Sequence, residues 1–516
     1  MKFNALLRMA VATGMAIAFD GACATDWPQF GYDVAHSGNN PAENVLTASN
    51  VAQMTRRYAV TIPDTVDSAP VYLANVSTPA GVRNLLFALS QTGKFLAIDA
   101  ATGSVMWSHT TTGSPVTSSS PAIDPDHAYV YSHGMDGKIH KYQVGDGTEI
   151  IDAHWPELFT LKPNVEKANG GLALATWNGT NYLYSVTSGY QDSGDYQGHL
   201  TTINLASGDQ KVFNVACSNN TTHLSNAAGA NDCPKLGGSA GAAIWGRGGA
   251  VFDASLGKLY ISSGNGAYTA NVSNGMYWGD SVLSLSPDGT GATPGVPYDS
   301  YTPMNFQYLD DSDSDLGSMS IALLPVPSGS SLLHVGMQGG KDDGLRLINL
   351  QDMSSGGGPR HIGGELQLIN SSHTYNGARE QSAVWVDGSG ATWVFHASFK
   401  NGLTAYKMSL GAGNVPMLTS QWNQYRGTAI GTTSAVIANG VLYHVGGCAN
   451  VDSNCLFARN PLTGAALWSS APLGELHWQS PIVVNGRVYL FDAASQLQAF
   501  GTTSVDLIFA NGFETP

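Results

Sequence analysis

The feature that most constrains the fold is a short segment that recurs along the chain. Residues 96–107 read LAIDAATGSVMW, and residues 457–468 repeat the pattern as FARNPLTGAALW. Both copies have an apolar segment, a turn with Asp or Asn followed by Thr-Gly, and a second apolar segment that ends in Trp. Gly supplies the positive φ that such a turn needs, and Asp or Asn hydrogen-bonds its own backbone. With weaker copies at residues 143–151 and 204–212, the pattern predicts a repeated strand–turn–strand unit.

A second pair of strands precedes each copy. Residues 479–490 read QSPIVVNGRVYL and residues 433–443 read TSAVIANGVLY, so each has two apolar segments joined by Asn-Gly. Asn-Gly between apolar segments is a strong signal of a two-residue hairpin. Residues 68–72 (SAPVY) and 119–123 (SSPAI) open the same unit earlier in the chain. Each repeat therefore predicts four antiparallel strands, which make one blade of a β-propeller.

The number of repeats predicts the size of the ring. The last repeat ends near Thr503 without its outer strand, whereas residues 54–60, MTRRYAV, form a spare strand before the first blade. No stretch shows sustained helical periodicity. We therefore predict an all-β, eight-bladed β-propeller of four-stranded antiparallel blades over residues 25–503, its ring closed by the N-terminal strand. The blades are expected to open near Ser68, Ser119, Gly170, Gly248, Asp315, Gln381, Thr433 and Gln479.

The first residues have the features of a secretion signal. Lys2 and Arg8 give a positively charged start, residues 9–19 form a short apolar run, and residues 22–24 read Ala-Cys-Ala, a small-x-small cleavage site. The run is too short for a spanning helix, and no later stretch has about 18 consecutive apolar residues. We expect residues 1–24 to be a signal peptide and the mature chain to be exported, periplasmic or secreted, and not transmembrane.

Four cysteines follow this segment in two close pairs, Cys217 with Cys233 and Cys448 with Cys455. Three connectivities are possible, and the local pairing is favoured because each pair spans one polar loop in an oxidising compartment. Neither pair has CxxC spacing or a nearby His in zinc-ligand register, which disfavours a metal site. The formal net charge of −15 argues against nucleic-acid binding, which needs a clustered basic surface.

At this point the chain resembles a known family. The motif Ala97-x-Asp99-x-x-x-Gly103-x-x-x-Trp107 is the tryptophan-docking motif of pyrroloquinoline quinone (PQQ) repeats, and residues 26–31, DWPQFG, look like the usual start of such chains. The mature chain is thus similar to the eight-bladed quinoprotein alcohol dehydrogenase-like propellers. The resemblance implies the fold, with the Trp of the motif packed between blades. It leaves the activity open, because the same repeat builds alcohol dehydrogenases with PQQ and calcium and also non-enzymatic propellers that bind protein partners.

The resemblance points to two residues that would hold the cofactor, Asn265 and Lys341, and Arg247 is a further candidate from its place in the chain. A site for PQQ needs cations for its carboxylates, a flat packing surface and a calcium ion. Asn265 ends an expected strand, as does the calcium-ligating Asn of the dehydrogenases; the alternative is an ordinary turn Asn before Gly. Lys341 resembles the cation beside the quinone oxygens, where it would stabilise the reduced quinone; the alternative is a solvated hairpin charge. Arg247 is expected near the axis, facing a carboxylate, although a structural pairing is the more usual role of such a residue.

An acidic loop lies at the entry to the fifth blade. It contains Asp310, Asp311, Asp313 and Asp315. The dehydrogenases place a catalytic Asp here, three residues before a second Asp that starts the strand. Asp315 matches the second position, but Ser312 occupies the catalytic one. Asp313, one residue later, is then the candidate catalytic base, with Asp313 and Asp315 as candidate calcium ligands; a calcium site without catalysis and a solvated loop remain alternatives.

Two further departures weigh against catalysis. The third blade is expected to offer a calcium-ligating Glu, but residues 188–199 contain only Asp192 and Asp195 as acidic residues. The disulfide between adjacent cysteines that lies beside the cofactor in several of these enzymes is also missing from the sequence. The sequence has no CxxCH, so no covalent haem is expected, and an enzyme of this type needs a separate electron acceptor.

Two functions are therefore open, and the sequence does not decide whether the chain is an enzyme. The first is an exported quinoprotein-like oxidoreductase that oxidises an alcohol or sugar with PQQ and calcium at the propeller axis. The second is a non-catalytic propeller that binds a protein or glycan partner in the cell envelope. Residues 504–516 form a C-terminal tail, in which VDLIFANGFE resembles a short tail of exported bacterial proteins. A terminal strand, a flexible end and a sorting or docking role are open for it.

Overall fold

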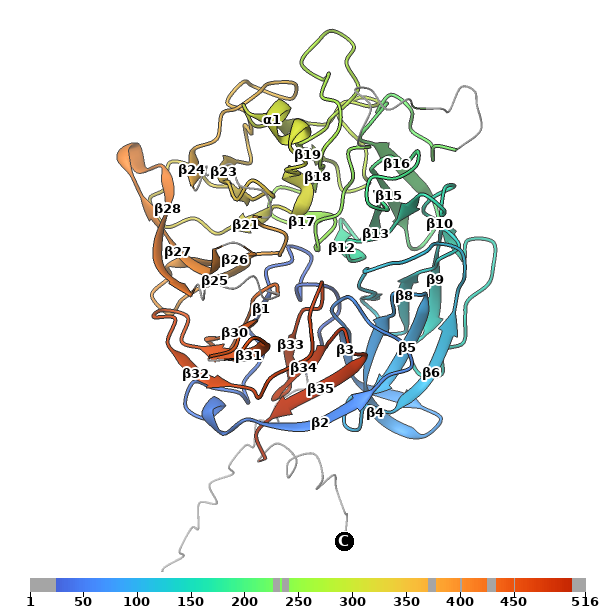
Figure 1. Ribbon diagram of the computed structural model, residues 1–516. Coiled ribbons are helices and arrows are strands. Elements are labelled where there is room, and N and C mark those ends of the chain that lie inside the picture. The colour runs from blue at the N-terminus through green and yellow to red at the C-terminus, as the bar shows by residue number, and fades with distance from the viewer. Residues whose placement is uncertain are drawn as a thin grey trace, which may run out of the picture.

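The protein forms a ring of eight four-stranded antiparallel sheets (Figure 1), as the repeats predict. The computed structural model describes residues 25–225, 233, 241–369, 377–399, 401–424, 433–449 and 451–503. The expected signal peptide (residues 1–24) and the tail (residues 504–516) lie outside the described residues. The predicted all-β, eight-bladed propeller is confirmed.

The first four blades follow one another along the chain, each with its strands in sequence order. They consist of β3 (Val71–Thr78), β4 (Gly81–Leu89), β5 (Lys94–Asp99) and β6 (Val105–Thr110); β7 (Ala122–Ile123), β8 (Tyr129–His133), β9 (Lys138–Gln143) and β10 (Glu157–Leu158); β12 (Ala173–Trp177), β13 (Thr180–Val186), β15 (His199–Asn204) and β16 (Gln210–Asn214); and β17 (Val251–Asp253), β18 (Lys258–Ser262), β19 (Val282–Leu285) and β20 (Asp299–Tyr301).

The next three blades repeat this order, and the eighth takes its outer strand from the N-terminal part of the chain. They consist of β21 (Ala322–Leu324), β22 (Val335–Gln338), β23 (Leu345–Asn349) and β24 (Gln367–Ile369); β25 (Ala383–Val386), β26 (Thr392–Ser398), β27 (Gly402–Leu410) and β28 (Pro416–Gln424); β29 (Val436–Ala438), β30 (Val441–Gly447), β31 (Asn454–Arg459) and β32 (Ala466–Ser469); and β33 (Ile482–Val484), β34 (Arg487–Phe491), β35 (Gln496–Gly501) and β2 (Thr55–Thr61).

The ring closes as the sequence predicts. Strand β2 pairs antiparallel with β35, with Thr55 opposite Gly501 and Thr61 opposite Gln496. The indole Nε1 of Trp468 donates to the carbonyl of Met54 at 2.9 Å, so the seventh blade also contacts the segment that enters β2. Closure by β2 covers the edge of β35, which would otherwise be open to pairing with another chain.

The Gly and Trp of the repeat have a packing cause. Trp107, at the outer strand of the first blade, lies on the Gly147 turn of the second blade and donates to the carbonyl of Val144 at 3.2 Å. Gly147 has a φ of +75°, and a Cβ there would lie 2.6 Å from the Trp107 ring. The Trp of the repeat therefore packs between blades, and its role is structural.

An N-terminal segment, residues 26–40, runs through the middle of the ring (Figure 1, blue). Trp27 exchanges two backbone hydrogen bonds of 2.9 Å with Tyr72 in the first blade. At its other end β1 (Asn39–Asn40) pairs in parallel with β29 in the seventh blade. The segment thus hydrogen-bonds to the inner strands of seven blades.

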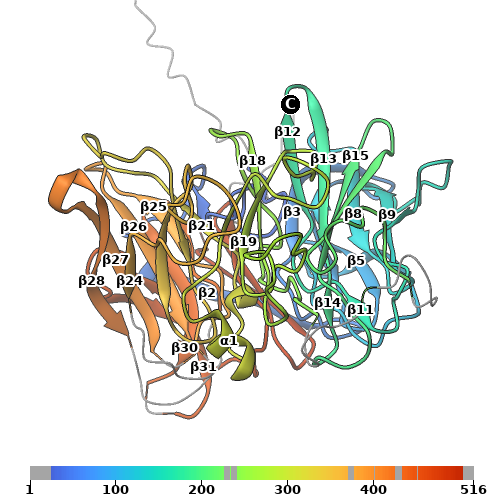
Figure 2. The ribbon, with the colours of Figure 1, turned by 90° about the horizontal axis from the view of Figure 1, so that it is seen from above.

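Few helices interrupt the sheets. Among the described residues the α-helical element is α1 (Phe306–Asp311), and 3-10 turns occupy Val51–Gln53, Leu316–Ser318 and Ala412–Asn414. In the described part of the chain no helix has the length and apolar character needed to cross a membrane. Figure 2 shows the ring from the side, with α1 and the short strands β11 (Glu166–Lys167) and β14 (Ser188–Gly189) towards the same end of the blades.

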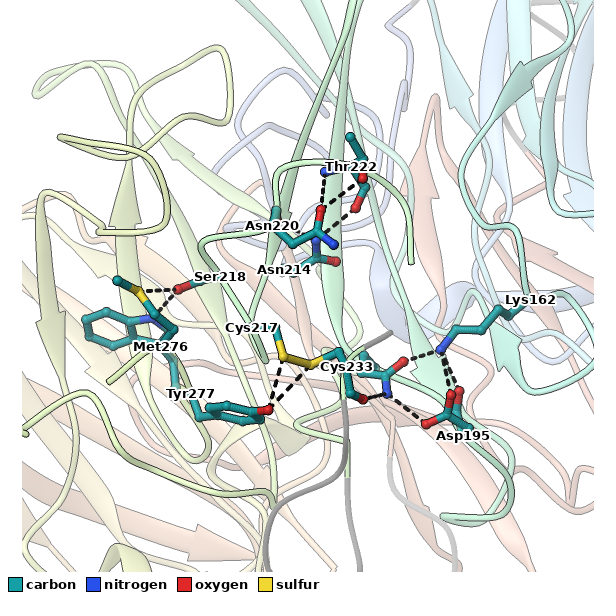
Figure 3. The surroundings of a disulfide bond; sticks show 12 residues. Lys162, Asp195, Asn214, Cys217, Ser218, Asn220, Thr222, Cys233, Met276 and Tyr277 are labelled. Atoms are coloured by element: carbon teal, nitrogen blue, oxygen red, sulfur yellow. Dashed lines mark hydrogen bonds and ion pairs between the residues drawn. A yellow bond between two sulfur atoms is a disulfide. The ribbon is translucent and has the colours of Figure 1, made fainter. Parts of the chain in front are cut away.

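The local cysteine pairing is confirmed. Cys217 is bonded to Cys233, and Cys448 to Cys455. The hydroxyl of Tyr277 lies 3.0 Å from Sγ of Cys217 (Figure 3). Gln197, just before β15, donates from its side chain to the carbonyl of Cys233 at 2.9 Å, so this hydrogen bond joins Cys233 to the third blade.

Candidate functional site

The predicted site residues come from loops at one end of the blades. In each blade the second strand ends where the first strand begins, because the strands are antiparallel. Asn265 follows β18, Lys341 follows β22, and Asp315 precedes β21. Helix α1 leads directly into the loop that carries Asp313 and Asp315. The fourth and fifth blades therefore bring these side chains to one place near the axis.

Lys341 is the centre of the cluster. Its Nζ lies 2.6 Å from Oδ1 of Asp313 and 2.6 Å from Oδ2 of Asp315. The side chains of Lys341 and Asp315 are 10 % exposed, whereas that of Asp313 is 49 % exposed. Although burial acts to lower the pKa of Lys341, the carboxylates of Asp315 and Asp313 outweigh it and raise the pKa above the ordinary lysine value. Lys341 is thus a fixed positive charge and not a solvated hairpin residue.

Asn265 is held by the same cluster. Its backbone N–H donates to Oδ1 of Asp315 at 2.7 Å, and its side-chain amide donates to the carbonyl of Leu309 at 2.5 Å and to Oδ2 of Asp280 at 3.3 Å. Both side-chain partners are acceptors, which fixes the NH₂ group towards them and Oδ1 away from them. Asn265 is 5 % exposed, and among the described residues its Oδ1 has no hydrogen-bond partner. A buried, unused amide oxygen is a natural ligand for a cation.

Asp280 is a buried carboxyl that lies next to Asn265 and matches no motif in the sequence. Burial raises its pKa well above the ordinary value, and the charge of Asp315 adds to the effect. Burial likewise raises the pKa of Asp315, with Lys341 acting in the opposite direction. Oδ1 of Asp280 accepts from the N–H of Leu316 at 2.9 Å, which places it beside the entry to β21. Two neighbouring buried carboxyls create a demand for positive charge that a bound cation would meet.

The oxygen donors partly fit a calcium ion. Asn265 Oδ1 and the carboxylate of Asp315 are hard oxygen ligands of the type that calcium takes, in sets of six to eight, whereas Asp280 already accepts from the NH₂ group of Asn265. The described residues contain no group of three or more His, Cys, Asp or Glu side chains arranged to share a metal ion. A cation bound here would therefore receive its remaining ligands from water or from a bound molecule.

A flat aromatic surface lies next to Lys341. Its Nζ is 5.3 Å from the ring centroid of Trp245, and the Trp245 ring meets that of Trp478 edge-on with a centroid distance of 5.9 Å. Trp245 is half-buried. An aromatic face beside a cation and oxygen ligands suits a planar, negatively charged ligand. Trp245 lies two residues before Arg247, and no sequence motif marks its ring as part of a site.

Arg247 is placed near the axis, but not in the Lys341 cluster. It is fully buried, and its guanidinium donates to the carbonyls of Ser118 at 3.0 Å and Trp478 at 2.8 Å. Burial lowers its pKa, while the charges of Glu380 and Asp67 act to raise it. Its hydrogen bonds join the entries to the second and eighth blades, so the observed contacts are structural.

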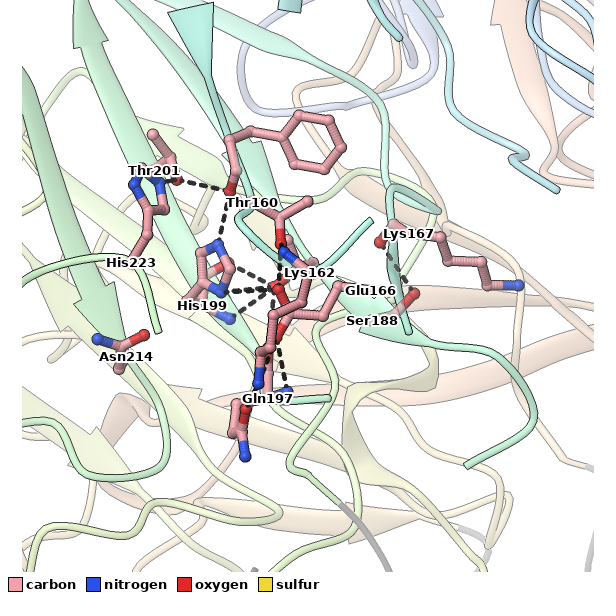
Figure 4. Close-up of polar contacts among 12 residues, drawn as sticks. Thr160, Lys162, Glu166, Lys167, Ser188, Gln197, His199, Thr201, Asn214 and His223 are labelled. Atoms are coloured by element: carbon pink, nitrogen blue, oxygen red, sulfur yellow. Dashed lines mark hydrogen bonds and ion pairs between the residues drawn. The ribbon is translucent and has the colours of Figure 1, made fainter. Parts of the chain in front are cut away.

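A buried glutamate does lie beside the third blade, although sequence analysis found none within residues 188–199. Glu166, on β11 next to β14, lies 3.4 Å from Nζ of Lys162 and accepts from the N–H of Gln197 at 3.0 Å (Figure 4). His199 lies 4.0 Å from the same carboxylate. Glu166 is thus neutralised by its own lysine. Lys162 and Glu166 are only four residues apart, but Glu166 reaches the third blade through the pairing of β11 with β14, which no spacing along the chain reveals.

The fold defines the class of protein: an eight-bladed β-propeller that is similar in fold to the PQQ-type propellers. The resemblance stated from the tryptophan-docking motif is confirmed at the level of the fold. The family described as outer membrane protein assembly factor BamB matches residues 66–157. No curated protein matches the chain in sequence.

Three solved structures show the likeness in detail. A europium-containing methanol dehydrogenase has a TM-score of 0.61 and 13% identity, with 92% of this chain and 98% of that chain covered. A quinohemoprotein alcohol dehydrogenase from Pseudomonas putida HK5 has a TM-score of 0.58 and 13% identity, with 92% and 80% covered. A quinohemoprotein alcohol dehydrogenase from Comamonas testosteroni has a TM-score of 0.56 and 13% identity, with 93% and 81% covered. At this identity the likeness concerns the fold alone.

Proposed function

We propose that the protein binds PQQ together with calcium in the axial site around Lys341 and oxidises an alcohol or a sugar there. The observation that carries the proposal is the buried Oδ1 of Asn265, which has no hydrogen-bond partner among the described residues. Its backbone N–H is bound to Asp315, which pairs with Lys341, and Nζ of Lys341 lies 5.3 Å from the ring centroid of Trp245. The likeness of the fold to quinoprotein dehydrogenases supports it.

The residues divide the work according to their surroundings. Asn265 Oδ1 and the buried Asp315 would hold the calcium ion, and Trp245 would pack against the planar ring system. Lys341, fixed by two carboxylates, would stabilise negative charge that develops on the quinone oxygens. Asp313 is half exposed and accessible to substrate, so it would accept the hydroxyl proton. When bound, the quinone supplies a two-electron acceptor for the hydride that leaves the carbinol carbon.

The site would work outside the cytoplasm. Residues 1–24 support export, and the two disulfides are of the kind that persist in a periplasmic or secreted protein. Because the sequence has no CxxCH for a covalent haem, the electrons would pass to a separate acceptor.

A second function is favoured by one specific feature. Lys341 already carries two carboxylate partners, and Glu166 is paired with Lys162, so the polar groups of the site are largely satisfied without a ligand. This favours a non-catalytic propeller that binds an envelope protein or a glycan.

One titration separates the two functions. PQQ is added to the purified protein with calcium or with a chelator, the absorption spectrum of the quinone is followed, and oxidation of alcohols and sugars is measured with an artificial dye. We expect calcium-dependent binding at micromolar PQQ that is lost in Asn265→Ala and Lys341→Met and kept in Lys138→Met, whose lysine is exposed on β9. Absence of binding contradicts the proposal. Binding without oxidation of any alcohol or sugar contradicts the catalytic part and favours the second function.

A further inference from the structure

A large cavity lies at the end of the ring opposite Lys341. It has a volume of about 740 Å³, and its walls come from the first hairpins of the fourth and fifth blades, from β25 and from the hairpin with residues 439–440. In each blade the first hairpin lies at the end opposite to the loop after the second strand, because the strands are antiparallel. Asn265 and Lys341 are carried by loops of the latter kind, so the cavity is separate from the candidate site.

The N-terminal segment forms one wall of the cavity and brings a carboxylate to it. The carbonyl of Val34 accepts from the N–H of Phe252 in the fourth blade at 3.0 Å. The carbonyl of Ser37 accepts from the N–H of Val384 in the sixth blade at 2.8 Å. Asp33 lines the cavity beside these contacts, with Oδ1 2.9 Å from the N–H of Ser37 and Oδ2 2.6 Å from its hydroxyl. Both contacts of the Asp33 carboxylate are with neutral groups, so it keeps its negative charge at the wall.

A second carboxylate in the wall, Asp253 at the end of β17, has one oxygen without a donor. Its Oδ1 accepts from the N–H of Ser255 at 2.8 Å, from the Ser255 hydroxyl at 2.5 Å and from the N–H of Leu256 at 3.2 Å. Among the described residues no group donates a hydrogen bond to Oδ2, and Nδ1 of His334 lies 3.9 Å from it, beyond hydrogen-bond distance. The side chain of Asp253 is 10 % exposed and lines the cavity. A buried carboxylate oxygen without a donor is costly, and a cationic donor in the cavity would remove that cost.

The rest of the wall is mainly apolar. Trp385 is half-buried in the lining, and among the described residues no second ring and no cation lies against its indole. Leu333 is 67% exposed and Val386 42% exposed, which gives the cavity an apolar rim. The described lining contains Asp33 and Asp253 but no Lys or Arg. The cavity thus combines negative charge, an open indole face and apolar side chains.

We propose that this cavity binds a small organic cation, namely an ammonium group carried on an apolar or aromatic body. The ammonium donates to Oδ2 of Asp253 and is attracted by the charge of Asp33, which makes a charge-assisted hydrogen bond. The body packs against Trp385 and Leu333, and an indole face attracts a cation that lies over it. A volume of about 740 Å³ lies within the range of small-molecule sites, which are mainly apolar with a few polar groups that fix the ligand.

Isothermal titration calorimetry of the full chain tests the cavity with two cations and their neutral counterparts. The cations are phenethylammonium and tryptammonium, and the counterparts are phenethyl alcohol and tryptophol, which have the same bodies without the charge. We expect one saturable site for the ammonium ions at millimolar concentration or below, and binding of the alcohols that is weaker by tenfold or more. PQQ and calcium are left out, because the cavity lies at the other end of the ring from the candidate site.

Matched substitutions locate the binding. Asp253→Asn removes the charge at Oδ2 and keeps the Oδ1 acceptor of the hairpin, so it should weaken binding of the ammonium ions by tenfold or more. Asp124→Asn is the control and should leave binding unchanged. Asp124 holds the equivalent place in the second blade, where its Oδ1 accepts from the N–H groups of Ala128 and Tyr129, and it lies outside the cavity. Trp385→Leu should weaken binding severalfold, and urea unfolding checks that each variant is folded.

Three results overturn the proposal. The first is the absence of saturable binding of both ammonium ions throughout the millimolar range. The second is equal binding of the ammonium ions and the alcohols, or an Asp253→Asn protein that binds the cations as tightly as the wild type, because the carboxylate then plays no part. The third is tighter binding of a neutral sugar, tested with glucose, than of either cation, since the cavity would then recognise hydroxyl groups and not positive charge.

Discussion

Replacement of Lys341 by Met gives the sharpest test of the charge arrangement at the axis. The substitution keeps most of the side-chain volume and removes the charge that lies 2.6 Å from both Asp313 and Asp315. Asp315 is then a buried carboxyl without its cation, and loss of one partner of a buried pair costs about 3–5 kcal/mol. Asp313 has the same distance to Lys341 but is half exposed, so Asp313→Asn should cost less than about 1 kcal/mol.

The cost should depend on pH. The folded-state pKa of Asp315 lies above the ordinary value, so the folded state favours the protonated carboxyl more than the unfolded state does. Stability is therefore lost as pH rises from the unfolded-state pKa through the folded-state pKa. Removal of Lys341 raises the pKa of Asp315 further. The deficit in the free energy of unfolding should therefore be smaller at pH 5 than at pH 8, and Lys341→Met with Asp315→Asn should recover most of it.

Urea unfolding followed by tryptophan fluorescence measures these differences, with wild type, the two single variants and the double variant compared at both pH values. A Lys341→Met protein that unfolds at the wild-type urea concentration at pH 8 would refute the reasoning, as would an equal deficit at pH 5.

Three further predictions concern the ring itself. Gly147→Ala should lower the free energy of unfolding in urea by about 2–4 kcal/mol, because strain at positive φ adds to a clash with the Trp of the preceding blade. Gly179→Ala, which also has a positive φ but open space around it, should cost about 1 kcal/mol, and equal costs contradict the packing role. Cys217→Ser should lower the free energy of unfolding by about 3 kcal/mol and Cys448→Ser should lower it by about 2 kcal/mol, because the two disulfides close loops of 16 and 7 residues. The reverse order in thermal unfolding argues against a loop-entropy origin. Burial lowers the pKa of His133 to about 3, so the free energy of unfolding should fall as pH drops below about 6.5, and it should fall less in His133→Gln. Urea midpoints of the two proteins between pH 7 and 4 measure this difference, and identical profiles contradict it.

The fold could be predicted from sequence because its signals are local. Asn-Gly hairpins, the Thr-Gly turn and its Trp all lie within one blade, and eight repeats leave few alternatives to a closed ring. The role of residues 54–60 followed from counting strands, and β2 fills that place. The N-terminal segment was recognised as a typical start, but its contacts with seven inner strands depend on the closed ring and have no local pattern.

The site could be predicted only in part. Asn265, Asp313, Asp315 and Lys341 each stood beside a recognisable strand end, and the structure brings them together. Asp280 joins them only through tertiary contacts, which no spacing along the chain reveals. The roles of the four residues in binding and catalysis are still predictions.

The most direct test of the proposed function is a crystal structure of the protein grown with PQQ and calcium. We predict density for a planar ligand against the ring of Trp245, with a calcium ion bound to Oδ1 of Asn265 and a carboxylate of Asp315, and with Nζ of Lys341 beside the quinone oxygens. A site that keeps the ion pairs of Lys341 and shows neither ligand nor ion at saturating concentrations would contradict the proposed function.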